Sequence, residues 1–312
     1  MREMVINGIR IRPGQSINIE IAIARLPSHT LIHLPVFIRS SKIDGPVVLI
    51  SGGIHGDEIN GVVAVKKMLE ENMFVPKKGA LIFIPLFNVY GFLSNTRTFP
   101  DGRDLNRSFP GSNKGSLASQ IAHIITTQII PNIDYGVDFH TGGRMLSNFP
   151  QIRVDFKDKK ALELAKAFGT HFIINSSYID KSFRKEAIKD NKSVLVFEGG
   201  ESMRLDDFAV EEAIAGTTRL LQYLGIIEEL LPKKESLIVK ESSWIRAKIS
   251  GIFIPTIKLG DPVKKGQVIA KITDPYGQVK VPVKSTSKGF VVGLNNLPVI
   301  NAGDALVHVG KI

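Results

Sequence analysis

Residues 46–58 read PVVLISGGIHGDE, an apolar run followed by two glycines and a polar end that includes His55 and Glu58. The run 46–51 has the length of a strand and is almost entirely apolar, which is typical of a strand buried on both faces of a sheet. Residues 58–72 carry apolar side chains at a helical spacing, at Val62, Val65, Met68 and Leu69. The stretch therefore predicts a buried strand, a turn with His55 and Glu58, and a helix.

Strand-like and helix-like segments alternate along the chain after this unit. Strands are expected at 80–87, 136–139, 151–156, 171–175 and 194–197, and helices at 117–129, 159–168, 182–190 and 207–224. Such alternation predicts an α/β fold with a mixed, mostly parallel sheet flanked by helices. Residues 1–44 read as short strands and turns. Residues 91–112 form a long polar loop, of the kind that is often functional.

The pattern changes near Pro232, and beyond residue 235 only short β-like runs remain between Gly and Pro. The run holds a repeat, because Val263, Gly266, Ile269 and Ile272 are matched 37 residues later by Ile300, Gly303, Leu306 and Val309. Two equivalent β-motifs predict a small pseudo-symmetric barrel or sandwich. We therefore expect two domains, residues 1–232 with an N-terminal β segment 1–44, and residues 233–312.

Composition narrows the chemistry that this chain of 312 residues can perform. It has no cysteine, so disulfides, thiolate nucleophiles and Cys-type zinc sites are excluded, and a metal must be held by His, Asp or Glu. The first residues contain no apolar signal-like run. The longest uncharged run, 115–133, is too polar to span a bilayer. We expect a soluble, cytoplasmic protein with no membrane contact.

The net charge is +10, and the excess is concentrated at the C-terminal end. From residue 233 onward there are 13 Lys and Arg against 5 Asp and Glu. A basic segment of this kind either binds nucleic acid or forms a solvated surface. Its few aromatic residues show no stacking pattern, so we favour the solvated surface and expect no nucleic-acid partner. Binding with a steep salt dependence would indicate the opposite.

Two histidine-containing motifs follow predicted strands. His55 and Glu58 are three residues apart at the end of the first strand, and His140 stands at the end of another, before two glycines. Ligands bind at the carboxyl ends of strands in open α/β sheets, and two His with one carboxylate suit a catalytic metal ion. Asp138 would lie on the same strand face and support a histidine ligand. The alternative is that His55 only caps the following helix and Glu58 only balances its N-terminal dipole.

The long loop concentrates guanidinium groups among turn-forming residues. Arg97, Arg103 and Arg107 lie there with Asn106 and Asp104. Arginine binds carboxylates with two parallel hydrogen bonds, so the loop could clamp a carboxylated substrate and stabilise an oxyanion. The alternative is a polar loop held together by its own ion pairs, such as Asp104 with Arg107.

A carboxylate follows the last predicted strand of the α/β part. Glu198 comes after the apolar run 194–197 and before two glycines. At a strand end it would be partly desolvated, as a general base requires. Glu201 is expected to lie further out, in solvent.

These motifs, in this order, resemble those of the succinylglutamate desuccinylase/aspartoacylase family, which is related to the zinc carboxypeptidases. The resemblance rests on His-x-x-Glu, Asp-Leu-Asn-Arg, Asp-Phe-His and Phe-Glu-Gly-Gly and covers about residues 40–225. It implies a zinc carboxypeptidase-like fold with one Zn²⁺ per chain, bound by His55, Glu58 and His140. It also implies that Glu198 acts as general base and acid.

The resemblance further implies roles for the basic residues. Asn106 and Arg107 would bind the substrate carboxylate, and Arg97 would polarise the scissile carbonyl, with Arg103 as the competitor for that role. Ser182-Phe-Arg184 is similar to a family pattern, which implies that Arg184 is a second substrate anchor.

The expected activity is zinc-dependent hydrolysis of an amide bond in an N-acyl amino acid or a related small carboxylated amide. The enzyme would thus be a deacylase acting on carbon–nitrogen bonds other than peptide bonds. The alternatives are a metallo-carboxypeptidase acting on peptides and a catalytically inactive binding protein. The C-terminal part is similar to biotinyl and lipoyl domains, but the comparable turn reads Asp274-Pro-Tyr-Gly277, without a modifiable lysine. We therefore expect it to cover the active site or to mediate assembly as a homo-oligomer.

Overall fold

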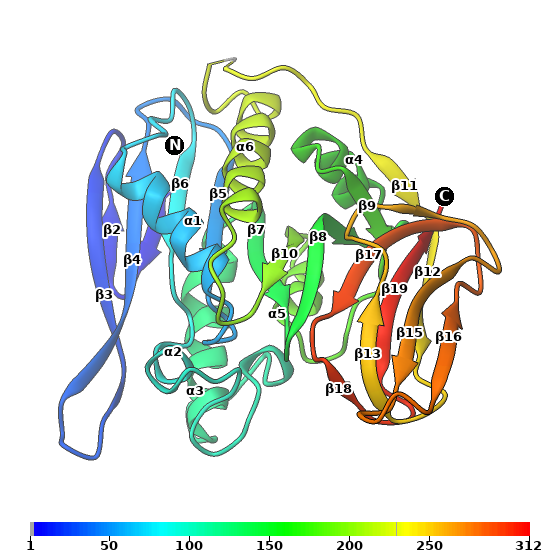
Figure 1. Cartoon of the computed structure of the whole chain (residues 1–312). Coiled ribbons are helices and arrows are strands. Elements are labelled where there is room, and N and C mark those ends of the chain that lie inside the picture. The colour runs from blue at the N-terminus through cyan, green and yellow to red at the C-terminus, as the bar shows by residue number, and fades with distance from the viewer. Residues whose placement is uncertain (1–2, 229) are drawn as a thin grey trace.

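The computed structural model describes residues 3–228 and 230–312 and shows one long mixed sheet with helices on both faces (Figure 1). The helices are α1 (Ile59–Glu70), α2 (Val89–Ser94), α3 (Leu117–Ile124), α4 (Lys159–Phe168), α5 (Phe183–Lys189) and α6 (Asp207–Tyr223). The 3₁₀ turns are η1 (Leu105–Arg107) and η3 (Ile130–Asn132), and a π-helical turn, η2 (Ile125–Ile129), continues α3.

The strands of the N-terminal and central part are β1 (Met4–Ile6), β2 (Ile9–Ile11), β3 (Ser16–Arg25), β4 (Leu31–Ser40), β5 (Val47–Gly52), β6 (Ala80–Ile84), β7 (Tyr135–Gly142), β8 (Leu146–Val154), β9 (Phe172–Asn175) and β10 (Ser193–Glu201). The later strands are β11 (Leu237–Val239), β12 (Glu241–Arg246), β13 (Gly251–Pro255), β14 (Pro262–Val263), β15 (Val268–Thr273), β16 (Lys280–Lys284), β17 (Gly289–Asn295), β18 (Val299–Ile300) and β19 (Ala305–Lys311).

The main sheet runs in the order β12-β19-β17-β8-β10-β7-β5-β6-β4-β3. Its centre is parallel, since β5 pairs with β6 and β7, and β7 pairs with β10, all in the parallel sense. The carboxyl ends of β5, β7 and β10 therefore lie side by side, and Glu198 is directly opposite His140 in the register. This is the edge at which the sequence predicts the functional residues.

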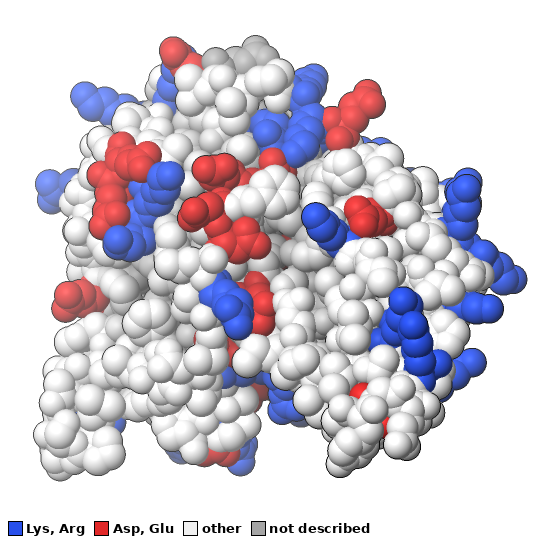
Figure 2. Space-filling model, in the orientation of Figure 1, with Lys and Arg blue, Asp and Glu red and all other residues white. Residues whose placement is uncertain are grey.

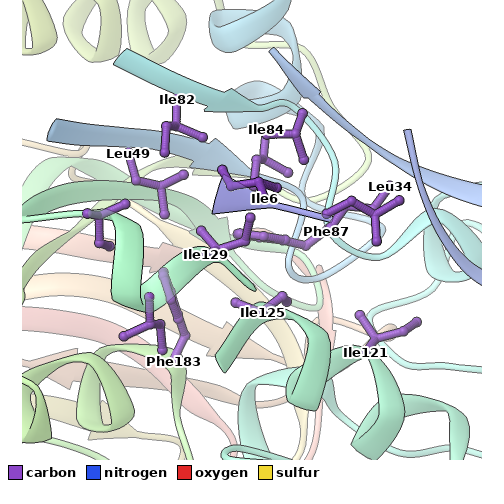
Figure 3. Close-up of a cluster of buried hydrophobic side chains, with 14 of the residues drawn as sticks. Ile6, Leu34, Leu49, Ile82, Ile84, Phe87, Ile121, Ile125, Ile129 and Phe183 are labelled. Atoms are coloured by element: carbon purple, nitrogen blue, oxygen red, sulfur yellow. The ribbon is translucent and has the colours of Figure 1, made fainter. Parts of the chain in front are cut away.

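The central strands are apolar because both of their faces are covered. Leu49 and Ile82 point to one face, where they pack with α3, η2 and Phe183 of α5 (Figure 3). Ile50 and Phe83 point to the other face, where they pack against α1, α4 and α6. Successive strand residues alternate between the faces, so a strand between two helical layers needs an apolar side chain at nearly every position.

The observed elements differ from the predicted ones at several ends. Strands β7 and β10 run on to residues 142 and 201, so His140 and Glu198 belong to the strands themselves. The predicted loop 91–112 includes the end of α2 and the turn η1. Strands β3 and β4, expected to be short, are ten residues each, because they pair along their length as a hairpin at the edge of the sheet.

The C-terminal strands confirm the 37-residue repeat. Strands β14 and β15 correspond to β18 and β19, and in both copies a backbone N–H is bound by a side chain three residues ahead, Lys264 N by Gln267 Oε1 and Asn301 N by Asp304 Oδ2. A second sheet, β16-β15-β13-β18, packs with β17 and β19 around a separate apolar core. Lys and Arg side chains gather on the outer side of this unit (Figure 2).

The two units share the main sheet. Strand β17 of the C-terminal unit pairs in the antiparallel sense with β8, and β11, which follows the predicted boundary at 232, pairs with β9. The division into residues 1–232 and 233–312 therefore stays a prediction. Across the described residues, no helix combines the length and the apolar character needed to cross a membrane.

Candidate metal centre and substrate pocket

His55, Glu58 and His140 converge at the carboxyl ends of β5 and β7. One ligand-type atom from each lies within 4.8 Å of the others, and all three side chains are buried. His55 Nδ1 is 2.7 Å from Glu58 Oε1, and His140 Nδ1 is 3.0 Å from Glu58 Oε2. The two Nδ1 atoms are 3.3 Å apart. The three side chains thus direct their donor atoms to one point, although His55 and His140 are 85 positions apart in the chain.

The far nitrogen of each imidazole faces an aspartate. His140 Nε2 lies 2.9 Å from Asp138 Oδ2, and His55 Nε2 lies 3.3 Å from Asp104 Oδ1. Asp138 is fixed in turn by the hydroxyl of Ser51, which donates to it at 2.9 Å. Hydrogen bonds of this kind set the tautomer of a ligand histidine and orient its ring. The predicted contact between Asp138 and a histidine of the cluster is present, whereas the contact of Asp104 with His55 was not expected.

The charges within this cluster are strongly coupled. Burial alone would raise the pKa of Glu58, but the two imidazoles outweigh it and hold that pKa well below its ordinary range. Burial likewise opposes the protonation of His140, yet Asp138 and Glu58 raise its pKa well above the usual value. The protein groups alone therefore attract a positive charge to the space between them.

The donor set fits a zinc ion. Two donors held about 2.0–2.1 Å from a tetrahedral zinc are ~3.3 Å apart, close to the separations observed here. Glu58 occupies the N-cap position of α1, but its side chain makes no capping hydrogen bond. Its carboxylate is instead paired with His55, His140 and Arg97. His55, Glu58 and His140 could hold a metal ion, and two His with one carboxylate are typical zinc ligands.

A pocket of about 310 Å³ opens beside the cluster and collects the predicted site residues. Its lining includes His55, Glu58, His140, Glu198, Arg97, Asn106, Arg107 and Arg184. Arg103 does not line it, and its side chain is 64% exposed and paired with Asp101. Of the two arginines that the sequence left in competition, Arg97 is the one beside the cluster.

Arg97 is held in position by two carboxylates. Its guanidinium donates from Nε and Nη2 to Asp104 Oδ2, at 3.1 and 3.0 Å, and its Nη1 is 3.3 Å from Glu58 Oε1. The pair of Asp104 with Arg107, the example given for a loop held by its own ion pairs, does not form, because the carboxylate of Asp104 contacts His55 and Arg97. The loop does contain two such ion pairs, Arg97 with Asp104 and Arg103 with Asp101. Arg107 is exposed and donates to the carbonyl of Asn106, and it makes no ion pair with an acidic residue in 3–228 or 230–312.

Both oxygens of Glu198 are bound by side chains from β8. Arg153 Nη1 is 3.2 Å from Oε1, and Asn148 Nδ2 donates to Oε2 at 2.8 Å. The Glu198 side chain is 12% exposed and faces the pocket. It is therefore partly desolvated, as predicted.

Glu201, expected in solvent, is buried. Strand β10 continues past a bulge after Glu198, so Glu201 still pairs with Gly142 of β7. Its carboxylate accepts hydrogen bonds from Ser147 and from Asn296 of the C-terminal unit. The sequence does not reveal this contact, because Asn296 is distant in the chain.

Arg184 is a buried cation whose hydrogen bonds go to the backbone. Its guanidinium donates to the carbonyls of Arg153, Ser176 and Ser177 and lies over the ring of Tyr178. Desolvation by burial lowers its pKa. Among the described residues it makes no ion pair, although it lines the pocket.

Several pocket residues were missed by sequence reasoning, among them three that reach the pocket from β8 and the C-terminal unit. Asn148 and Arg153 come from β8, and Trp244 comes from β12 in the C-terminal unit. The segment 151–156 was predicted as a strand, but the sequence does not show which strand it pairs with. Trp244 is the single tryptophan of the chain and is easily noticed in the sequence, but nothing in the sequence places it against this pocket.

Trp244 stacks on a histidine that burial keeps neutral. The two rings are 4.7 Å apart and nearly parallel, and His308 is buried. Burial, with the nearby charge of Arg153, lowers the pKa of His308 to about 3. The folded protein thus keeps His308 neutral, while the unfolded chain protonates it below about 6.5.

This difference predicts a pH-dependent free energy of unfolding. The unfolded state binds more protons between pH 3 and 6.5, so stability rises with pH in this window and falls on acidification, by at most ~1.4 kcal/mol per pH unit from this group. In His308→Phe, which keeps a ring against Trp244, denaturant unfolding at pH 5 and 7 should show a smaller difference than in the unsubstituted protein. Equal differences in the two proteins would refute the assignment.

A mixed sheet with this residue cluster at the carboxyl ends of its parallel strands defines an α/β protein with a candidate metal centre. Residues 44–224 match the family model described as the succinylglutamate desuccinylase/aspartoacylase catalytic domain. The chain belongs to this family, which confirms the resemblance seen in the sequence.

Individual relatives agree with this assignment. The chain is 31% identical over 286 residues to the N-alpha-acetyl-L-2,4-diaminobutyric acid deacetylase of Halomonas elongata, covering 86% of this chain and 83% of the relative. The product-bound structure of the ectoine utilization protein EutE (DoeB) from Ruegeria pomeroyi superposes with a TM-score of 0.84 at 25% identity, over 96% of each chain. A succinylglutamate desuccinylase from Silicibacter sp. TM1040, 23% identical, shares the fold over 100% of both chains with a TM-score of 0.85. The predicted fold class is confirmed.

Proposed function

We propose that the protein is a zinc-dependent deacylase that hydrolyses the amide bond of an N-acyl amino acid or a closely related carboxylated amide. The observation that carries this proposal is the pocket, in which the His55–Glu58–His140 donor set and the carboxylate of Glu198 face the same space. The Halomonas elongata relative, named for the removal of an acetyl group from an amino acid, supports the same substrate class.

The basic residues of the pocket suit the carboxylate of such a substrate. Arg107 is exposed and makes no ion pair with an acidic residue of the described chain, so its guanidinium is free to bind two carboxylate oxygens. Arg184 is a second candidate anchor, because a buried cation without an acidic partner is stabilised by an anionic ligand. Asn106 lines the same wall, and its side-chain oxygen Oδ1 accepts a hydrogen bond from the backbone N–H of Phe183.

The remaining residues suit the hydrolytic step. Zinc, when bound by His55, Glu58 and His140, acts as a Lewis acid that lowers the pKa of water. Glu198 accepts a proton from the attacking water and returns it to the nitrogen of the leaving amine as the carbon–nitrogen bond breaks. Arg97, close to Glu58, donates a hydrogen bond to the oxygen that gains charge from the scissile carbonyl.

A substrate panel tests this proposal. The zinc-loaded protein is incubated with N-acetyl and N-succinyl amino acids and, in parallel, with dipeptides of the same residues, and the free amine is measured. We expect turnover of at least one acyl amino acid and much slower cleavage of the dipeptides. Preference for dipeptides would instead indicate a metallo-carboxypeptidase, and binding without turnover of either would indicate an inactive binding protein.

A further inference from the structure

The proposed general base is oriented by an amide that the proposed chemistry does not use. Asn148 of β8 is 4% exposed, and its Nδ2 donates to Glu198 Oε2 at 2.8 Å. Arg153, five residues further along β8 and opposite Val196 in the register, binds the other oxygen. The carboxylate therefore cannot turn without breaking a hydrogen bond to Asn148 or the ion pair with Arg153.

The C-terminal unit packs directly against this amide. Gly293 of β17 lies opposite Asn148 in the register of the two strands. A Cβ atom at position 293 would be 3.0 Å from Asn148 Oδ1, 3.1 Å from His308 Cβ and 3.3 Å from Trp244 Cη2. A methyl group at this position would therefore require its neighbours to give way by a few tenths of an ångström. The space around Asn148 Oδ1 is thus bounded by the C-terminal unit, while Asn148 Nδ2 donates the hydrogen bond to Glu198.

We propose that Asn148 is a positioning residue for Glu198, and that the C-terminal unit sets its orientation through the close contact at Gly293. This inference rests on the proposed function, in which Glu198 moves the proton. It gives the C-terminal unit a part in catalysis, because its docking on β8 determines where the carboxylate of Glu198 points.

The consequence for the reaction is specific. Groups that orient a base affect the chemical step, and small displacements of a catalytic group have large effects on the rate. Substrate binding depends on other residues, chiefly Arg107, which does not contact Asn148. A change at the Gly293–Asn148 contact should therefore lower kcat and leave KM nearly unchanged.

The first test is Gly293→Ala in the full-length, zinc-loaded protein, measured on the best substrate of the panel. The added methyl group must displace Asn148 Oδ1 or its neighbours, so we expect kcat to fall at least about tenfold, with KM within about twofold. The matched control is Val292→Ala on the same strand. Val292 is fully buried in a different apolar cluster, and its truncation weakens the packing of the unit without touching Asn148. Equal losses of kcat in both variants would overturn the proposal.

A double-mutant cycle tests whether the effect passes through Asn148. Asn148→Ala should lower kcat to a similar extent, and adding Gly293→Ala to it should cause little further loss, because the amide that the methyl group displaces is gone. Losses that multiply would mean that Gly293 acts by another route, and the proposal would be wrong.

A measurement that does not depend on turnover tests the positioning of Asn148 separately from the proposed hydrolytic function. The side-chain amide signals of Asn148 in a ¹⁵N–¹H NMR spectrum can be assigned by their absence in Asn148→Ala. Both Gly293→Ala and Glu198→Gln should shift them, and Val292→Ala should not. If the panel shows no turnover, the proposed function fails, and this spectrum still tests the contact. Unshifted signals in Gly293→Ala would refute the role of the C-terminal unit.

Discussion

His55→Ala is expected to abolish both metal binding and hydrolysis. The substitution removes one of three donor atoms, and it leaves Glu58 and His140 buried beside a space that they cannot fill. Two remaining protein ligands do not form the three-ligand site that catalytic zinc requires. Metal content per chain, measured by mass spectrometry on protein purified without added metal, should be about one zinc in the unsubstituted protein and near zero in the variant.

The control for this experiment is a histidine outside the pocket. His33 lies on β4, two strands from β5 in the sheet, is partly exposed near Glu20 and does not line the pocket. His33→Ala should retain the full zinc content. Equal metal in His55→Ala and the unsubstituted protein, or none in either when zinc is resupplied, would contradict the assigned site.

The sequence was sufficient to predict the fold class and the three candidate ligands. A short apolar run ending in Gly52-Gly53 predicts a buried strand followed by a turn, and His55 stands in that turn. The carboxyl ends of parallel strands lie at one edge, so His140 and Glu198 are brought there by the βαβ pattern alone.

The contacts between distant segments could not be predicted in this way. Asp104 was considered only as a possible partner of its near neighbour Arg107, and the fold brings it instead to His55 and Arg97. Local spacing favours pairs that are close in sequence, whereas the loop that carries Asp104 folds back over the strand ends. The partner of a carboxylate in such a loop is decided by tertiary packing.

Strand register was the second source of error. Asn148 reaches Glu198 because β8 runs antiparallel to β10, and Glu201 is buried because β10 continues past a bulge. Neither the partner of a strand nor a bulge follows from the alternation of apolar residues. The pairing of β17 with β8 and the place of Trp244 in the pocket also depend on strand partners. Both come from the segment that the sequence predicts as a separate domain.

Glu198→Gln is expected to lower kcat by about 10²- to 10⁴-fold and to leave the zinc content unchanged. A glutamine fills the same volume and can accept the hydrogen bond from Asn148, but it cannot take a proton from water at neutral pH. The loss of a positioned general base has an effect of this size. Because Glu198 is not among the three donors, metal content measured on the same samples should match the unsubstituted protein.

Glu201→Gln provides the matched control for this prediction. Glu201 lies on the same strand and is as well buried, but its carboxylate contacts Ser147 and Asn296 and does not line the pocket. Its conversion to the amide should leave kcat within about threefold, because the proton transfers of the reaction do not involve it. If Glu198→Gln kept a turnover close to normal, or if both variants lost activity equally, Glu198 would not be the general base, and the proton would have to move through another group of the pocket.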